Sequence, residues 1–263
     1  MKKFLPLLSA FLLTVFLVAC GGDDNSGSSE GGSNPTPPPT DTQQSPGQIS
    51  GLGEYPGELQ GTSFTLPQGV RVDGMITGYR PATLSRSEKN TYAKDLPQKS
   101  AFDLLPADAT IGGGYDVLLK IALINSNSTP TEVVFPERLI LKSKSSQYQH
   151  GLLLKKTSVT IPAGARYVIS LVMYCGNMER GAPSSSEIYE FGVISNSPLL
   201  KDLTDRLVNK KINVEEFNSD PSDYQIYIDQ YLRLASIVWN LTDRGIALSD
   251  DDKNWIARLP ASR

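Results

Sequence analysis

The chain divides into three segments of unlike composition, and only the last of them can form a folded domain. Residues 1–20 are almost entirely apolar, whereas residues 21–50 consist mainly of Gly, Ser, Pro and other polar residues. Residues 51–263 have the mixture of apolar and polar side chains that a globular fold requires. We therefore expect one globular domain over 51–263, which lies within the usual size range of a single domain.

The first segment has the features of a secretory signal peptide. Lys2 and Lys3 provide a positive start, and an apolar run follows over 4–18. The run is shorter than the ~20 residues that a membrane-spanning helix needs, and small residues rather than basic residues end it. We expect residues 1–19 to be removed as a signal peptide rather than kept as an anchor helix.

The end of this run, Leu17-Val18-Ala19-Cys20, resembles the lipobox of bacterial lipoproteins. The resemblance implies cleavage between Ala19 and Cys20, after which Cys20 becomes the first residue and carries fatty acids such as palmitate. It also implies delivery to the outer membrane, because Gly21 and not aspartate follows the cysteine. Two or more acyl chains give stable membrane attachment. We therefore expect a protein of the bacterial cell envelope that is held at the membrane by its lipid.

Residues 20–50 are expected to form a disordered tether that begins at the lipidated cysteine. The part after Cys20 contains six Gly, six Ser and five Pro, four acids and no base. Such a segment cannot bury enough apolar surface to offset the entropy of ordering it. A flexible coil of this length spans roughly 30 Å, so the tether would hold the domain just clear of the lipid surface.

Composition excludes several classes of function. A net charge of -3 gives no basic patch of the kind that nucleic-acid binding requires. His150 is the only histidine, so a zinc site with several histidines cannot form. Asp250, Asp251 and Asp252 follow Ser249 as acids of a first helical turn, and successive helical residues point in different directions. We therefore expect no cofactor, no metal site and no nucleic-acid partner.

Strand-like periodicity runs from Gly51 to Tyr174. The segment 115–124 is apolar on both faces except at Lys120, which is typical of a strand inside a sandwich or a barrel. Turn residues separate further short apolar segments, which favours a mainly β fold. We predict an antiparallel β-sandwich over 51–176, for which an immunoglobulin-like topology fits. The expected strands are 63–66, 70–76, 115–124, 132–135, 138–141, 147–154, 158–161 and 167–174.

Residues 177–263 are predicted to be mainly helical. Ser197-Pro198 and Asp220-Pro221 each combine a capping side chain with a proline at the first helical position. Apolar residues at helical spacing follow both pairs, and Ser249 begins a third helix that Pro260 ends. We expect these helices to pack against the β region.

Cys175 is the only cysteine that remains once Cys20 is acylated, so no disulfide can form within the chain. It ends a predicted apolar strand, which favours a buried structural thiol. A reactive thiol is the alternative, and its general base would have to be His150, the only histidine.

A second interpretation of Cys175 comes from a resemblance. Tyr174-Cys175 at a strand end, followed by helices and by Ala235-Ser236-Ile237-Val238-Trp239, is similar to the layout of thioester domains in bacterial surface adhesins. In that family the cysteine is joined to a glutamine four residues before the tryptophan. The resemblance covers residues 167–245, and the glutamine position is Ala235 here. The resemblance therefore implies the layout of such a domain without its covalent chemistry.

Anchor, tether and domain together predict a non-enzymatic module for binding, adhesion or assembly, whose partner is a protein or a glycan. The alternative is an envelope lipoprotein hydrolase that uses a pair of carboxylates. Glycoside hydrolysis needs two such groups about 5 to 9.5 Å apart, which no sequence pattern in this chain identifies.

Overall fold

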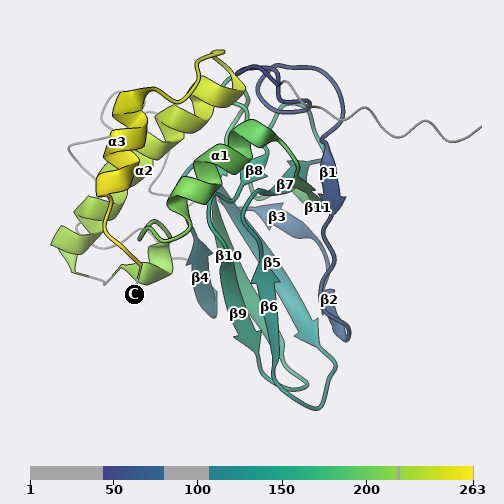
Figure 1. Ribbon diagram of the computed structural model, residues 1–263. Coiled ribbons are helices and arrows are strands. Elements are labelled where there is room, and N and C mark those ends of the chain that lie inside the picture. Colours follow the sequence, from purple (N-terminus) through teal and green to yellow (C-terminus); the bar gives the residue numbers. More distant parts are fainter. Residues whose placement is uncertain (1–43, 80–106, 218–219, 263) are drawn as a thin grey trace, which may run out of the picture. The chain divides into compact units, whose positions relative to one another are not determined.

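The two longest apolar segments become the central strands, β5 (Val117–Asn125) and β10 (Arg166–Cys175), which pair antiparallel along most of their length. The computed structural model describes residues 44–79, 107–217 and 220–262. Figure 1 shows these strands beside the helices that follow them in the chain. The other strands are β1 (Gly61–Ser63), β2 (Val70–Val72), β3 (Ile76–Gly78), β4 (Ala109–Gly112), β6 (Thr131–Phe135), β7 (Leu139–Ser143), β8 (Gly151–Leu152), β9 (Thr157–Ile161) and β11 (Ile188–Ser195).

The main sheet closes on itself. Its strands pair in the order β5, β3, β11, β7, β8 and β10, and β10 pairs again with β5, so six antiparallel strands form a closed barrel. Three further strands extend the barrel wall: β1 pairs with β11, β2 with β5, and β4 runs parallel to β10. Closure pairs the backbone N–H and C=O groups that would be unpaired at the two edges of an open sheet.

The predicted β-sandwich with an immunoglobulin-like topology is wrong, although the mainly β character is confirmed. Short strands separated by turn residues favour a sandwich, whereas the strand with two apolar faces is compatible with a sandwich or a barrel. In the structure, Leu119 and Ile121 of β5 point into the barrel core, whereas Leu118 on the other face packs against Tyr227 and Ile228 of a helix. The second apolar face is therefore covered by a helix and not by a second sheet.

A separate ribbon of two strands, β6 and β9, packs against the barrel and ends in the lower part of Figure 1. Val133 and Phe135 of β6 are fully buried and belong to the barrel core. Glu132 and Val134 alternate with them and are exposed, as the two-residue period of a strand requires.

The helices begin where the sequence predicts. They are α1 (Pro198–Leu207), α2 (Pro221–Thr242) and α3 (Asp250–Arg258), with a short 3-10 helix η3 (Val214–Glu216) between the first two. Ser197, Asp220 and Ser249 each accept a hydrogen bond from a backbone N–H of the helix they precede. Each side chain thereby satisfies a donor that has no partner within the helix.

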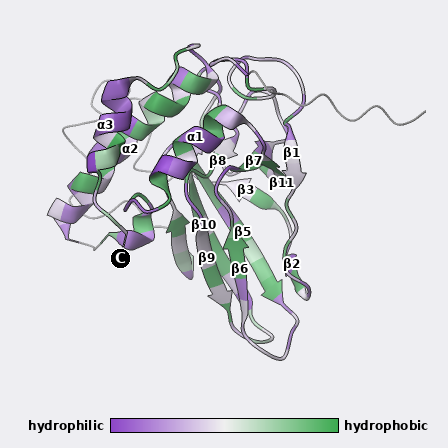
Figure 2. Cartoon of the chain, viewed as in Figure 1, coloured by the Kyte–Doolittle hydropathy of each residue, from purple (hydrophilic) through white to green (hydrophobic). Residues whose placement is uncertain are grey.

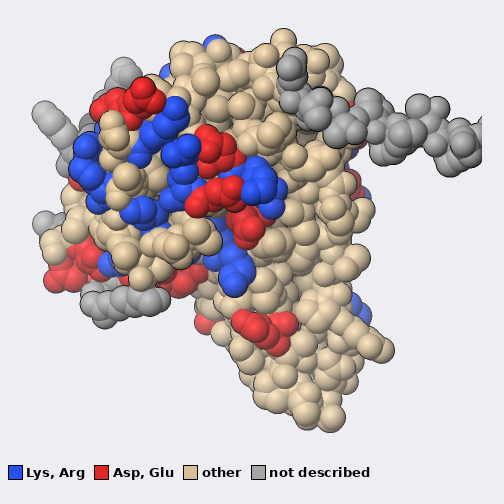
Figure 3. Space-filling model, in the orientation of Figure 1, with Lys and Arg blue, Asp and Glu red and all other residues tan. Residues whose placement is uncertain are grey.

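The three helices cover one side of the barrel with their apolar faces. Leu200 and Leu203 of α1, Leu234 and Val238 of α2, and Ile256 of α3 are buried in one cluster. Figure 2 shows the polar faces of the same helices turned outward. On that outer surface, where Figure 3 shows intermixed basic and acidic groups, the ion pairs include Lys201–Asp205 and Arg206–Asp202.

Several parts of the fold differ from the predicted segments. β4 lies outside every predicted strand, the predicted strand 70–76 is divided into β2 and β3, and only β8 forms within the predicted strand 147–154. β11 lies within the region 177–263 that was expected to be mainly helical, and it is a barrel strand between β3 and β7. Its pairing register with β7 shifts between Phe191 and Ile194, so the strand lacks a simple alternation. At the other end, Ile49 and Leu52 are buried, so packed residues occur before the expected boundary at Gly51.

Candidate functional site

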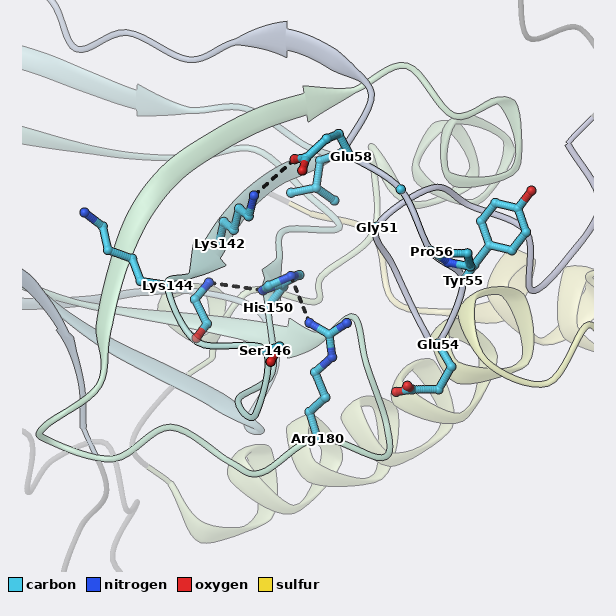
Figure 4. Close-up of a pocket in the computed structure, with 13 residues that line it drawn as sticks. Gly51, Glu54, Tyr55, Pro56, Glu58, Lys142, Lys144, Ser146, His150 and Arg180 are labelled. Carbon is cyan, nitrogen blue, oxygen red and sulfur yellow. Dashed lines mark hydrogen bonds and ion pairs between the residues drawn. The ribbon is translucent and has the colours of Figure 1, made fainter.

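The candidate site is a hollow of about 370 Å³ beside the hairpin formed by β7 and β8, which we call the His150 pocket. Its size lies at the lower end of the range for small-molecule sites. Three stretches of chain far apart in the sequence form its walls: the loop 51–59, the segment 142–150 and the loop after β10 (Figure 4). The lining residues are Gly51, Glu54, Tyr55, Pro56, Gly57, Glu58, Leu59, Lys142, Ser143, Lys144, Ser146, His150 and Arg180.

The side chain of Asn177 joins these walls by hydrogen bonds. Its side chain is fully buried, its Oδ1 accepts from the backbone N–H of His150 at 3.1 Å, and its Nδ2 donates to the carbonyl of Gly53 at 2.7 Å. Gly53 has a φ of 57°, and a Cβ there would lie 1.9 Å from the carbonyl oxygen of Thr242. Only glycine fits this approach of the loop to the end of α2.

The loop that carries Arg180 is fixed in the same way. The Gln149 side-chain amide donates to the Arg180 carbonyl at 3.1 Å, and the backbone of Gly181 exchanges hydrogen bonds with Gln147 and Gln149. On the opposite wall, the hydroxyl of Ser143 donates to the buried Glu187 carboxylate at 2.6 Å. Hydrogen bonds therefore fix the positions of the segments that carry the polar groups of the pocket.

His150 is 5% exposed, and each of its ring nitrogens lies 3.1 Å from a hydrogen-bond donor. Nδ1 faces the backbone N–H of Ser143, and Nε2 faces a terminal guanidinium nitrogen of Arg180 (Figure 4). A neutral imidazole has one N–H and one acceptor nitrogen, and arginine only donates. Because Nδ1 accepts from the N–H of Ser143, the proton of the neutral ring lies on Nε2. The Nε2–H group therefore faces the guanidinium of Arg180, which is also a donor.

The electrostatic surroundings keep the His150 ring neutral. Burial lowers its pKa from 6.5 to about 4, and the positive charges of Arg180 and Lys142 act in the same direction. The ring therefore presents a neutral N–H to the hollow at physiological pH.

The charges around the pocket are only partly paired. Lys142 lies 3.2 Å from Glu58, and Lys144 lies 3.4 Å from Glu190 outside the lining. Among the residues that the structure describes, neither Arg180 nor Glu54 belongs to an ion pair. The pocket thus offers one guanidinium without a carboxylate partner and one carboxylate without a cation.

Cys175, the candidate thiol, lies in the barrel core and is fully buried. Its sulfur accepts from the backbone N–H of Asn177 at 3.3 Å, whereas the His150 ring faces Ser143 and Arg180. Burial, with a further contribution from Asp116, raises the pKa of the thiol far above its usual range. The structure therefore does not bring the cysteine and the histidine together as a catalytic dyad.

The strand and the helix that carry the resemblance to thioester domains do pack together. Tyr174 of β10 and Ala235 of α2 are buried in one cluster, and Trp239 packs against both this cluster and the barrel core that contains Cys175. Ala235, the position that the resemblance compares with the family's glutamine, is 2% exposed.

Three carboxyl groups with raised pKa values lie outside the His150 pocket. Burial raises the pKa of Asp116 to about 6, although its hydrogen bond from the Tyr231 hydroxyl, 2.6 Å long, opposes the shift. Burial also raises the pKa values of Glu215 and Asp243. Glu215 accepts from the N–H of Gly112, and Asp243 accepts from the N–H of Met178. These hydrogen bonds hold the three groups as parts of the framework.

The remaining predicted residues have simpler outcomes. Asp252 forms a capping box with Ser249, and Asp250 and Asp251 occupy the first turn of α3, as expected. Within the described parts of the chain, no group of three or more metal-ligating side chains is found. Ala19 and Cys20 lie outside the described residues, as does most of the expected tether.

Most of the pocket is not predictable from the sequence. His150 has a candidate role there as the base for Cys175, and no pattern points to Arg180. A basic residue shortly after a buried strand end is a weak signal, and the buried Asn177 that fixes its loop gives no pattern in sequence.

Comparison with known proteins gives no match: no protein-family model, no curated protein and no solved structure is significantly similar to this chain. The geometry of the pocket is therefore the basis on which a function is proposed.

Proposed function

We propose that this protein is a lipid-anchored, non-enzymatic binding module of the bacterial cell envelope and that the His150 pocket is its ligand site. The observation that carries the binding role is the convergence of three chain segments on one hollow of about 370 Å³. Buried hydrogen bonds from the side chain of Asn177 to His150 and to Gly53 fix the positions of two of those segments. A pre-formed pocket of this kind is typical of a binding site, because little ordering is required when the ligand arrives.

The anchor rests on the amino-terminal sequence. The apolar run, the lipobox-like residues ending at Cys20 and the Gly/Ser/Pro-rich segment fit a lipoprotein of the outer membrane that carries its domain on a tether. None of the described helices has the length and hydropathy needed to cross a bilayer. The partner is a protein or a glycan of the envelope or of its surroundings.

The position of the titrating carboxyl groups supports binding over hydrolysis. A hydrolase would place a carboxyl group with a raised pKa in the substrate cleft. Here Asp116 is in the interior beneath α2, and Glu215 is hydrogen-bonded to Thr157 and Gly112. Neither residue lines the His150 pocket.

Lipid attachment is tested by feeding cells an alkyne analogue of palmitate and labelling it after lysis. The wild-type chain should be labelled and should sediment with membranes. The Cys20→Ala chain should be unlabelled, and the Cys175→Ala chain, its matched control, should be labelled like the wild type. An unlabelled wild-type chain would contradict the lipoprotein assignment.

Ligand binding in cells is tested with a photo-crosslinking residue in place of Glu54, whose side chain extends toward the same hollow as Arg180 (Figure 4). Irradiation should add mass to this protein. The same residue at Val208, which is 59% exposed at the end of α1, should give no adduct. Equal results at the two positions would argue against the pocket as the binding site.

A further inference from the structure

The His150 pocket contains an arrangement that is incomplete without a ligand. The Nε2–H of His150 and the guanidinium of Arg180 are both donors, and they face each other 3.1 Å apart. Two donors that meet in this way leave both hydrogens without an acceptor, a condition that costs free energy in a partly buried site. An oxygen placed beside the pair would accept from both groups.

The surrounding charges define the acceptor more closely. The lining carries three cations and two acids, and Lys142 is paired with Glu58 while Lys144 is paired with Glu190. Arg180 is the remaining cation, and the nearby acids would repel a group that carries two negative charges. A planar group with a single negative charge fits best, because its oxygens match the fixed, fork-like arrangement of N–H donors on a guanidinium.

From this geometry we infer that the pocket recognises a carboxylate group of the proposed protein or glycan partner, whose two oxygens accept from the guanidinium of Arg180 and from the Nε2–H of His150. The inference rests on the proposed binding role of the pocket and assigns the chemical class of its ligand. Glu54, on the facing loop, would lie beside a neutral or positive part of that ligand. Tyr55, which is 40% exposed, and Pro56 supply apolar surface in the same wall.

The single histidine makes a direct experiment possible. Full-length protein in detergent, labelled with ring-15N histidine, gives the signals of one imidazole. Without ligand, the signals should be those of a neutral ring with the proton on Nε2. A ring protonated on Nδ1, or an imidazolium at pH 7, would contradict the arrangement on which the inference rests.

The probes are sodium N-acetylglycinate, its neutral isostere N-acetylglycinamide, and inorganic phosphate. The carboxylate should shift the Nε2 signal in a saturable way, whereas the amide should not and phosphate should bind more weakly. No saturable shift with the carboxylate, or tighter binding of phosphate, would overturn the inference.

Variants separate the role of the guanidinium from general charge. Arg180→Gln should weaken binding of N-acetylglycinate at least about tenfold, since it removes a charge-assisted hydrogen bond. Arg180→Lys should weaken it by less, because the charge remains and the fork is lost. Arg206→Gln, on the exposed face of α1 outside the pocket, is the matched control and should change binding less than about threefold. A similar loss in Arg180→Gln and Arg206→Gln would show simple charge attraction and would overturn the specific contact.

The two proposals can fail separately. If the carboxylate does not bind but the crosslinker at position 54 still gives an adduct in cells, the pocket binds another class of ligand. If the carboxylate binds but no adduct forms in cells, the chemistry of the pocket stands and the proposed cellular role fails. Thermal unfolding of each Arg180 variant shows whether lost binding reflects lost folding, and Arg180→Lys provides the second test if Arg180→Gln is unstable.

Discussion

His150 is buried and Asp116 is half-buried, and their pKa values are shifted by about the same amount, yet their surroundings differ in kind. Asp116 lies between the barrel and α2, where the Tyr231 hydroxyl donates to it and aromatic side chains close the space around it. His150 lies at the wall of a hollow, and its Nε2 faces a donor. A shifted pKa therefore marks loss of contact with water in both regions, and the mismatched donors beside a cavity are the feature that supports the proposed binding site.

The largest expected effect concerns the frame of the His150 pocket. Asn177→Ala would leave the buried N–H of His150 and the carbonyl of Gly53 without their partner. Each unsatisfied buried group costs about 1–3 kcal/mol, so we expect the free energy of unfolding to fall by about 4 kcal/mol. Chemical denaturation measures the change. Asn209→Ala, at an exposed position, is the control and should change the free energy by less than about 0.5 kcal/mol.

A loss below about 1 kcal/mol in Asn177→Ala would show that water replaces these bonds easily. The walls of the pocket would then be held less firmly than the structure indicates. The difference in rigidity between the pocket and the closed region around Asp116 would be correspondingly larger.

The next effect is the acid sensitivity that His150 confers. Its pKa is about 4 in the folded state and 6.5 as the ordinary value, so the unfolded chain binds the proton first. As the pH falls from 6.5 to 4, the contribution of His150 to stability should therefore decrease, by about 3 kcal/mol over the full window. Asp116 acts in the opposite direction over this range, so the effect of His150 is the difference between the wild type and His150→Gln, which should shift in favour of the variant as the pH falls. Denaturant titrations of both proteins at pH 7 and pH 4.5 measure it, and equal pH dependence in the two would contradict the prediction.

Asp116 should act in the opposite direction over the same range. Its pKa is about 6 in the folded state against 3.8 ordinarily, so the folded chain keeps the proton longer as the pH rises. The charged form is disfavoured by burial, and stability should fall by about 3 kcal/mol between pH 3.8 and pH 6 and stay low above it. Asp116→Asn should remove this dependence and be more stable than the wild type at pH 8. A less stable variant at pH 8 would show that the carboxylate is well solvated by its donors.

The smallest expected effect concerns the paired cations at the pocket. The Lys142 side chain is 37% exposed and that of its partner Glu58 is 82% exposed. Such pairs contribute below about 1 kcal/mol, so Lys142→Met should hardly change the free energy of unfolding. Thermal unfolding in low and high salt measures the difference. A loss of several kcal/mol would mean that this ion pair, and not the hydrogen bonds of Asn177, holds the loop 51–59.

Much of the secondary structure follows from local signals in the sequence. The three helix starts are set by Ser197, Asp220 and Ser249, because an N-cap is a contact between residues close in the chain. The choice between a sandwich and a closed barrel does not follow from the sequence, since a strand with two apolar faces can be covered on its outer side by a second sheet or by a helix. β11 escaped prediction because Glu190 and Gly192 interrupt its apolar pattern at the shift in register.

The candidate site was even less accessible to sequence reasoning. Its walls come from segments around Gly53, His150 and Arg180, and only the three-dimensional pairing of their loops brings them together. The decisive observation, a histidine with a donor at each nitrogen, depends on the direction of two side chains and leaves no pattern in the amino-acid order.

The packed residues that precede the pocket wall have a mechanical consequence. The Ser197 hydroxyl donates to the Gln44 side chain at 2.5 Å, the N–H of Gly47 donates to the carbonyl of Leu241, and Ile49 is buried. A force applied to the chain at residue 44 would be borne by these contacts with α1 and α2 before it reached the loop 51–59. The contacts would therefore keep the wall of the His150 pocket in place under load.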